Sequence, residues 1–459
     1  MEAVLAYTGA GAVAFGWIVG HPSVPVVLAS VGGVLTWVLL MALPWPVAAW
    51  VGSLARRDGR PGVVSFLVIG SAGTLAVEGA LTHSPWPLPW GLLGHTQALV
   101  PTVRDAAALA GAPALSAWVL GANATVVLGL RGRPTAALVG LLVLAGTAAG
   151  AAWTERDRSP SSRQATVWMV QPNMAAASWA DIANTARVRR LLHLTNGALD
   201  TARTPPDLVV WPETALPPDR PGLYDSLRTW TARHDISLLT GAVARIHDPA
   251  AAYDHANRAV LFGTGGPRPH YDSHYDKAYP VPFVEHVPGA SSLPALRALR
   301  VDGGGVQGYR AGRGATPLAT DSLIVGPLIC FESAVSPHAR RYVVGSPPVD
   351  MLVTLAQTGW WGTAWPARQH RAIARLRAIE TGRPLLLASV RGPTTVVLPD
   401  GSAGPSRAWN ETGVVSATVS LPTALTVYAR TGDWIAPVSA LLFALGTAVA
   451  LVRHRSRHV

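Results

Sequence analysis

The sequence contains almost no cysteine and almost no lysine. Among its 459 residues, Cys330 is the one thiol and Lys277 the one ammonium group, while arginine supplies the other 36 of the 37 basic residues. A single cysteine excludes an internal disulfide framework. An ammonium group is a compact charge with a tunable pKa, so a lysine kept in an arginine-rich chain is a candidate for chemistry that guanidinium does not perform.

Charge is scarce as well. Charged residues make up 14% of the chain, whereas an ordinary soluble domain carries about 25%. Only ten of them lie in residues 1–153. Seventeen tryptophans and many branched apolar residues exclude a disordered chain. The net charge of +11 comes without any nucleic-acid-binding motif, so we do not expect nucleic acid as a partner.

Long apolar runs predict a membrane domain, because a helix needs about 20 apolar residues to cross the bilayer core. Candidate runs cover residues 3–20, 24–55, 62–82, 106–130, 134–153 and 435–452. The second is expected to form one long helix, or a span and a re-entrant piece broken near Pro44 and Pro46. The start does not resemble a cleavable signal peptide, because it lacks a basic segment and further spans follow.

These runs divide the chain into four predicted parts. They are a membrane domain with about five transmembrane helices (1–153), a soluble domain (154–434), a last transmembrane helix (435–452) and a basic tail (453–459). Arginine gathers in the loops at 56–60 and 131–133 and in the tail, and the positive-inside rule places all three in the cytoplasm. Residues 154–434 are then expected outside the cytoplasm.

Two polar features interrupt the membrane domain. Glu78 lies within an apolar run, where an ionisable group is costly and indicates a function, unless it lies near the outer end and snorkels to water. The Trp- and Pro-rich segment at 85–90 suits a membrane interface. Its Trp86 and Trp90 are candidate substrate contacts.

The region between residues 164 and 419 alternates short apolar runs with helical patterns, which predicts one α/β domain. The expected strands are 165–170, 208–211, 237–243, 259–262, 323–330, 351–355, 385–389, 395–398 and 414–419. Residues 185–201 and 365–381 are expected to form amphipathic helices.

Candidate reactive residues follow the predicted strands. Cys330 ends an apolar strand and precedes a predicted helix, a junction that exposes a nucleophile; the alternative is a buried core cysteine. Glu213 follows the strand at 208–211, where sites of α/β sheets gather; the alternative is a solvated loop carboxylate. Lys277 and Glu285 share a Pro-rich apolar segment that is expected to be packed.

These strings carry a resemblance to a known family. Trp211-Pro212-Glu213, a lysine eight residues before Glu285, and a strand-ending Cys-Phe-Glu resemble the Glu-Lys-Cys arrangement of the nitrilase superfamily. With apolar spans on both sides, the chain resembles the bacterial apolipoprotein N-acyltransferases. Further matching strings lie at 170–173, 375–380, 382–384 and 428–434.

The resemblance implies a nitrilase-like α-β-β-α sandwich inserted between transmembrane helices. It implies Cys330 as nucleophile, Glu213 as general base and Lys277 as the group that stabilises the oxyanion. Glu285 would be the second acidic residue near the site.

Supporting positions follow from the same resemblance. Trp179 and Glu332 match positions that the family uses, and Phe331 replaces its tyrosine while retaining a backbone N–H for an oxyanion hole. Trp360 and Trp361 are further candidate substrate contacts.

The implied activity is acyl transfer in the bacterial cell membrane. An acyl chain would pass from a membrane phospholipid to a cysteine thioester, and then to the N-terminal amine of diacylglyceryl-cysteine apolipoproteins. We expect a multi-pass monomer that uses no cofactor. The alternatives are a membrane-tethered nitrilase-type amidase that releases its acyl group to water, and an inactive family member that serves as a binding protein.

The sequence departs from the family pattern in places. Asn-Asp-x-Trp-Phe-Gly is replaced by residues 357–362, which read Gln-Thr-Gly-Trp-Trp-Gly, and Val284 replaces a glycine. We also expect the chain to lack the family's first one or two spans, because its acidic run and its Trp-rich segment come early in the sequence. No metal is expected, because His270 and His274 lie in a Pro-flanked segment without a third ligand cluster.

Overall fold

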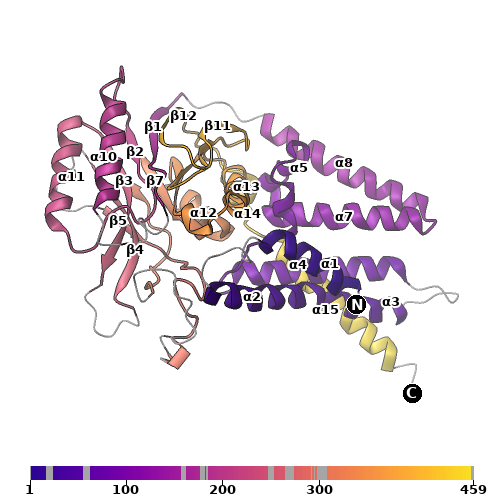
Figure 1. Ribbon diagram of the computed structural model, residues 1–459. Coiled ribbons are helices and arrows are strands. Elements are labelled where there is room, and N and C mark those ends of the chain that lie inside the picture. The colour runs from indigo at the N-terminus through magenta and orange to yellow at the C-terminus, as the bar shows by residue number, and fades with distance from the viewer. Residues whose placement is uncertain are drawn as a thin grey trace. The chain divides into compact units, whose positions relative to one another are not determined.

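The computed structural model describes residues 2–16, 24–54, 62–156, 162–175, 181, 185–246, 253–263, 273–290, 292–293, 295–296 and 308–455. The chain divides into two compact units (Figure 1). One is built mainly from Ser30–Arg158 and Thr426–Val459, and the other mainly from Ser159–Leu425. We call them the membrane unit and the sandwich unit.

The membrane unit consists of helices. They are α1 (Glu2–Phe15), α2 (Val24–Ala42), α3 (Pro44–Leu54), α4 (Val63–His83), η2 (Leu93–Gln97), α5 (Pro101–Arg104), α6 (Ala107–Ala110), α7 (Ala112–Leu130), α8 (Pro134–Arg156), α14 (Val427–Thr431) and α15 (Ile435–Arg455). Five helical segments among the described residues are long and apolar enough to cross a membrane: Gly33–Leu54, Val63–His83, Ala112–Leu130, Pro134–Ala152 and Ile435–Arg455.

The structure gives the bounds of the helices that the apolar runs predicted. The run 24–55 is broken at Leu43, next to Pro44 as one of the two alternatives predicted, and Pro44 suits the first position of α3. The run 106–130 yields α7 only from Ala112, since Gly111 has a φ of +73° and ends α6. In the run 3–20, α1 covers Glu2–Phe15, and residues 17–20 lie outside the described residues.

Small residues let α4 lie close to its neighbours. A Cβ added at Gly73 would lie 2.4 Å from Pro44 of α3, and one at Gly79 would lie 2.4 Å from Ala436 of α15. Helices in membranes associate through such small-residue contacts. Glycines of α4 thus set how closely these helices pack.

Glu78 of α4 lies inside this packing. Its side chain is 2% exposed, so it does not reach the surface of the unit as the snorkelling alternative required. Its Oε1 accepts a hydrogen bond of 2.7 Å from the backbone N–H of Leu93. The carboxylate therefore anchors η2, which follows the Trp-rich segment.

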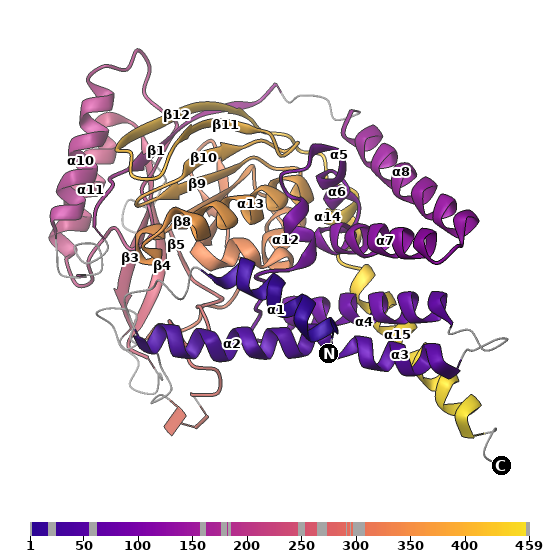
Figure 2. The same ribbon diagram turned by 45° about the vertical axis from the view of Figure 1, so that its right-hand side comes forward.

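The sandwich unit contains two six-stranded sheets. The first has the order β12-β1-β2-β3-β4-β5 and the second β11-β10-β9-β8-β7-β6 (Figure 2). The strands of the first are β1 (Gln164–Gln171), β2 (Leu208–Val210), β3 (Ser237–Arg245), β4 (His255–Phe262), β5 (Ser273–Asp276) and β12 (Gly413–Ser420). Those of the second are β6 (Leu318–Ala319), β7 (Ile324–Ile329), β8 (Met351–Ala356), β9 (Leu385–Ser389), β10 (Thr394–Val397) and β11 (Ala403–Arg407).

Side chains that alternate between the two faces of each strand pack the sandwich unit into four layers, with helices on the outer face of each sheet. In β1, Val167 and Met169 enter the core shared by the two sheets, whereas Trp168 and Val170 enter a second core under α10 (Ala186–Leu199) and α11 (Pro221–His234). Successive strand residues point to opposite faces, so one strand serves both cores. Helices α12 (Ser336–Val344) and α13 (Ala364–Thr381) contact β7 and β9 of the other sheet. The predicted α-β-β-α sandwich is confirmed.

The strand directions gather the predicted site residues. Strands β1, β2 and β3 are parallel, as are β7, β8 and β9. Strand β5 runs the same way as β3, because β4 is antiparallel to both. Glu213, Lys277 and Cys330 each follow the carboxyl end of a strand, where α/β sheets form their sites.

Candidate active site

Cys330 occupies a sharp turn. It follows β7 directly and opens the short 3-10 helix η4 (Cys330–Ala334), as the predicted strand-to-helix junction required. Its φ of +51° lies in the left-handed region, which costs a residue other than glycine about 1–3 kcal/mol. The surrounding structure must therefore hold this turn.

Two buried side chains hold the carbonyl group of Cys330. Ser333 Oγ donates to this oxygen at 3.0 Å. His370 Nε2 of α13 lies 3.0 Å from the same oxygen and 2.7 Å from Ser333 Oγ. Burial lowers the pKa of His370 to about 4, so the imidazole is neutral at neutral pH. Sequence reasoning missed this histidine, which showed only as one polar residue of a predicted helix.

Lys277 lies between two carboxylates. Its Nζ is 2.7 Å from Glu285 Oε2 and 3.5 Å from Glu213 Oε1, and its side chain is 1% exposed. Burial alone would lower the pKa of Lys277, but Glu285 and Glu213 outweigh it and raise this pKa above its ordinary value. The lysine is therefore a cation despite its burial.

Both oxygens of Glu213 have partners. Asn257 Nδ2 donates to Oε1 at 2.7 Å and to Glu285 Oε1 at 3.2 Å. The backbone N–H of Gln357 donates to Oε2 at 2.7 Å. Asn257 belongs to β4 but lies before the strand predicted at 259–262, and no local pattern marked it as a site residue. It links the two carboxylates that flank Lys277.

Burial and nearby charges raise the pKa of both Cys330 and Glu213. Burial raises the pKa of the Cys330 thiol, and the negative charge of Glu213 raises it further while Lys277 opposes both. Burial also raises the pKa of Glu213, although Lys277 lowers it. A thiol of high pKa needs a base, and a carboxylate of raised pKa is better suited to accept its proton.

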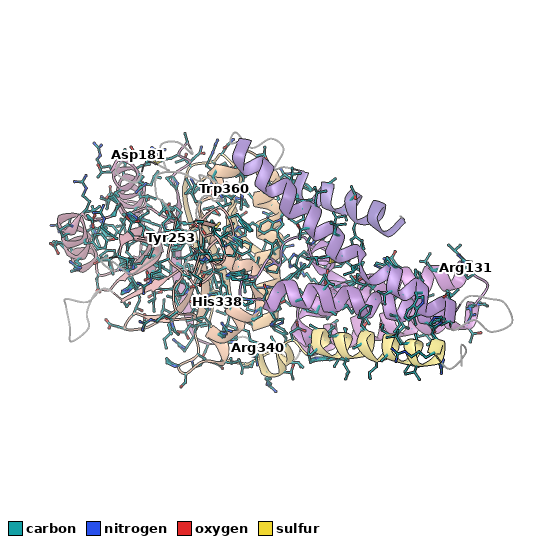
Figure 3. The ribbon with its side chains drawn as sticks, turned by 90° about the horizontal axis from the view of Figure 1, so that it is seen from below. Arg131, Asp181, Tyr253, His338, Arg340 and Trp360 are labelled. Atoms are coloured by element: carbon teal, nitrogen blue, oxygen red, sulfur yellow. The ribbon has the colours of Figure 1, made fainter. Side chains whose placement is uncertain are left out.

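Glu332 connects the lysine segment to the cysteine turn. Its Oε1 accepts from the backbone N–H of Ala278 at 2.7 Å, directly after Lys277. Its Oε2 accepts from the N–H of Ile329 at 2.7 Å, directly before Cys330. Burial raises the pKa of Glu332 to about 7 against these hydrogen bonds. The same oxygen Oε1 accepts from Tyr275, whose hydroxyl lies 2.9 Å from His338 Nε2; Figure 3 labels this histidine.

The remaining predicted residues are placed as follows. Phe331 is buried in η4 next to Cys330. Trp360 and Trp361 lie in the turn after β8, and Trp361 contacts His370 edge-on at 5.6 Å between ring centroids. Trp86 is exposed and Trp90 is buried in the membrane unit. Trp179 lies outside the described residues. Within the described ranges, no group of three or more His, Cys, Asp or Glu is arranged to hold a metal ion.

The chain is similar to known proteins over most of its length. Residues 164–427 match the carbon-nitrogen hydrolase family. The chain is 29% identical over 441 residues to the apolipoprotein N-acyltransferase of Brucella melitensis, covering 91% of this chain and 78% of the relative. It is 30% identical over 367 residues to the apolipoprotein N-acyltransferase of Gloeobacter violaceus, covering 78% and 67%. The chain belongs to the apolipoprotein N-acyltransferase family.

Membership in the apolipoprotein N-acyltransferase family concerns both units. The match to the Brucella relative covers 91% of the chain, and therefore extends well beyond residues 164–427 into the membrane unit. The protein from Chlorobaculum tepidum, of the same name, is 28% identical over 412 residues, 82% of this chain and 75% of its own. The apolar helices therefore belong to the matched region together with the sandwich.

Proposed function

We propose that this chain transfers an acyl chain from a membrane phospholipid, through a thioester on Cys330, to the N-terminal amine of diacylglyceryl-cysteine lipoproteins. The observation that carries the proposal is the buried cluster of Glu213 and Lys277 at the strand ends that also bear the Cys330 turn. The names of the relatives supply the substrate class.

The first half-reaction forms the thioester. As the sulfur of Cys330 attacks the ester carbonyl, Glu213 accepts the thiol proton. The ammonium group of Lys277 stabilises the negative oxygen of the tetrahedral intermediate. When the intermediate collapses, the C–O bond to glycerol breaks and Glu213 returns the proton to the leaving alkoxide. A lysophospholipid departs and the acyl chain remains on sulfur.

The second half-reaction repeats these roles. The neutral amine of the lipoprotein attacks the thioester, Glu213 accepts a proton from the nitrogen, and the sulfur leaves and regains that proton. An amide and a free thiol result. Each transfer moves a proton within the site and leaves the sum of its charges unchanged, so the buried environment does not have to accommodate an additional charge. One cysteine can thus serve two substrates in turn.

The proposed orientation of the chain in the membrane follows from the distribution of arginine residues. The chain is a membrane protein, with several helices of sufficient length and apolar composition. We place the loops at 56–60 and 131–133 and the tail at 453–459 in the cytoplasm, because arginine is concentrated there. Residues 154–434 then lie outside the bacterial cell membrane, between transmembrane parts at 1–153 and 435–452. We expect the enzyme to act as a monomer.

The description of the matched family favours a second candidate, a membrane-tethered amidase that gives its acyl group to water. The test mixes the purified full chain with phosphatidylglycerol and a synthetic diacylglyceryl-cysteine peptide. Mass spectrometry should show the peptide gaining one acyl group. Release of fatty acid with an unchanged peptide would show that the acyl group passes to water, as the second candidate requires, and the absence of both products would contradict the proposed transfer. Cys330→Ala is the control.

A further inference from the structure

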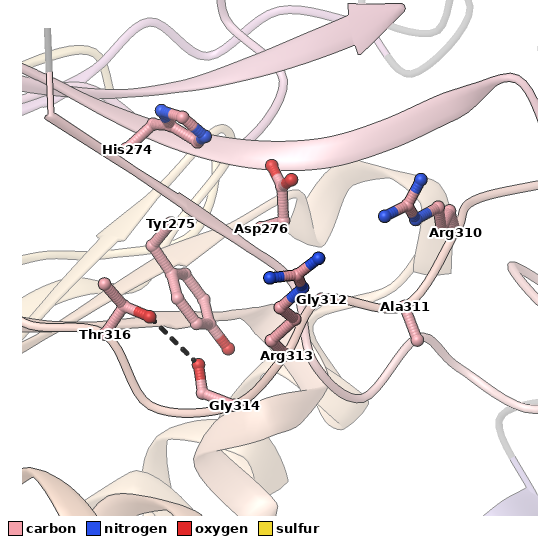
Figure 4. A pocket seen from close by; sticks show the side chains of 9 residues that line it. All are labelled: His274, Tyr275, Asp276, Arg310, Ala311, Gly312, Arg313, Gly314 and Thr316. Carbon is pink, nitrogen blue, oxygen red and sulfur yellow. Dashed lines mark hydrogen bonds between the residues drawn. The ribbon is translucent and has the colours of Figure 1, made fainter. Parts of the chain in front are cut away.

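A cavity of about 350 Å³ lies beside the strand that leads to Lys277 (Figure 4). Its walls are β5 and the loop that contains Arg310 and Arg313. Strand β5 is the last strand of its sheet, and the N–H of Gly312 donates to the carbonyl of Lys277 at 2.8 Å. The loop thus packs against the free edge of this strand.

The cavity carries an excess of positive charge. Arg310 and Arg313 line it together with one carboxylate, that of Asp276, and with His274. Figure 4 shows the side chains of Arg310, Arg313 and Asp276 among those that line the cavity. Arg258 already contacts both oxygens of Asp276, at 2.6 and 3.0 Å. Among the described residues that line the cavity, the guanidinium groups of Arg310 and Arg313 outnumber the one carboxylate, and this excess of positive charge suits an anion.

The backbone of the loop is built for this arrangement. A Cβ at Gly312 would lie 2.1 Å from the carbonyl oxygen of Asp276, so only glycine allows the loop to lie this close to the strand. Gly314 has a φ of +124°, which other residues rarely adopt. The two glycines flank Arg313 and fix the direction in which it leaves the backbone.

We propose that this cavity binds a phosphate group, and that the phosphate is that of the glycerophospholipid acyl donor. Arginine pairs with phosphate through two parallel N–H donors, which lysine does not provide. The choice of the lipid rests on the proposed function. A glycerophospholipid carries its phosphate and its acyl ester on one glycerol, so an enzyme that attacks the ester holds the phosphate nearby. The loop reaches this region through its hydrogen bond to the carbonyl of Lys277.

The test uses the full chain in detergent micelles and two acyl donors. One donor is phosphatidylglycerol, and the other is p-nitrophenyl palmitate, which has no phosphate. The variant is Arg310→Gln/Arg313→Gln. The matched control is Arg189→Gln/Arg190→Gln, which removes two exposed charges from α10. Intact-mass spectrometry follows the acyl adduct on Cys330 at a series of donor concentrations. Calorimetry measures the binding of inorganic phosphate.

We expect the double variant to raise the half-saturating concentration of phosphatidylglycerol about 10-fold or more, with that of the phosphate-free ester unchanged. If phosphatidylglycerol is unaffected but the variant loses binding of inorganic phosphate, the cavity is a phosphate site and the lipid assignment is wrong. An equal effect on both esters, or no effect on donor or phosphate, overturns the proposal. If neither ester acylates Cys330 in the unaltered chain, the proposed function fails, and the phosphate titration still tests the cavity.

Discussion

Replacing Lys277 by arginine tests whether the site needs only a positive charge at this position or needs the geometry of the ammonium group. The change keeps a cation between Glu285 and Glu213, whose oxygens lie 2.7 and 3.5 Å from Nζ. The fold should therefore persist, because the two buried carboxylates keep a counter-charge. The guanidinium group is larger and planar, and its donors do not fall where the ammonium donors lie. Positioning of the oxyanion should fail even though the charge remains.

The expected magnitude follows from the role proposed for the lysine. Losing one donor to an oxyanion typically slows a reaction about 100- to 1000-fold. Lys277→Arg should therefore lose at least about 100-fold in the rate of thioester formation. Lys277→Met should behave differently, since it leaves two buried carboxylates without a cation, a loss that typically costs about 3–5 kcal/mol of stability.

The assay is single-turnover acylation of Cys330 by p-nitrophenyl palmitate, followed by intact-mass spectrometry. Thermal unfolding in the same detergent checks that Lys277→Arg is folded. Near-normal thioester formation by a folded Lys277→Arg protein would refute the reasoning. It would mean that any cation between the carboxylates suffices, and that the single lysine of the chain has no special role.

Three further predictions concern the nucleophile, the buried histidine and the topology. Cys330→Ala and Cys330→Ser should abolish transfer without unfolding the protein, and a hydroxylamine-labile lipid adduct surviving in Cys330→Ala would contradict the covalent step. Burial lowers the pKa of His370 from 6.5 to about 4, so this group stabilises the fold fully above pH 6.5. Roughly 3 kcal/mol should be lost as the pH falls from 6.5 to about 4, because the unfolded state binds its proton first. The melting temperature should fall over this pH window, and it should fall less in His370→Gln. The same pH dependence of the melting temperature in both proteins would show that His370 does not cause the loss. Reporter tags placed near residues 161 and 421 should be accessible from outside, and those near residues 57, 133 and 459 only from the cytoplasm. The opposite labelling would overturn the orientation.

The parts of the site that local sequence could predict are those that follow apolar strands. Cys330 comes directly after a buried strand and Glu213 shortly after another, so strand direction alone brings them to one end of the sandwich. Lys277 follows β5, whose sequence Ser-His-Tyr-Asp shows no apolar alternation. This strand was not predicted, because only Tyr275 among its residues enters the core. The lysine was instead singled out by its rarity and by the resemblance.

The unpredicted residues depend on contacts between distant parts of the chain. Asn257 donates a hydrogen bond to Glu213, which lies 44 positions away in the sequence. His370 contacts the carbonyl oxygen of Cys330, which lies 40 positions away. Neither has a local pattern that reveals its partner, because pairing between elements decides which face each side chain occupies. Each holds a reactive group in place by hydrogen bonds that a sequence window does not contain.

The departure at residues 357–362 changes less than its sequence suggests. Glu213 takes its hydrogen bond from the backbone N–H of Gln357, which every residue except proline provides. The side chain of Gln357 has another task, since its Oε1 accepts from the N–H of Gly359 at 2.7 Å and caps the turn that bears Trp360 and Trp361. A side-chain oxygen at this position accepts the hydrogen bond of a turn N–H, as asparagine does at helix N-termini.

Thr358, the second substituted residue, is buried, and its Oγ1 accepts from the N–H of Arg391. The substituted residues thus support the turn, while the backbone supplies the contact to Glu213, the proposed base, so the departure is compatible with the proposed activity.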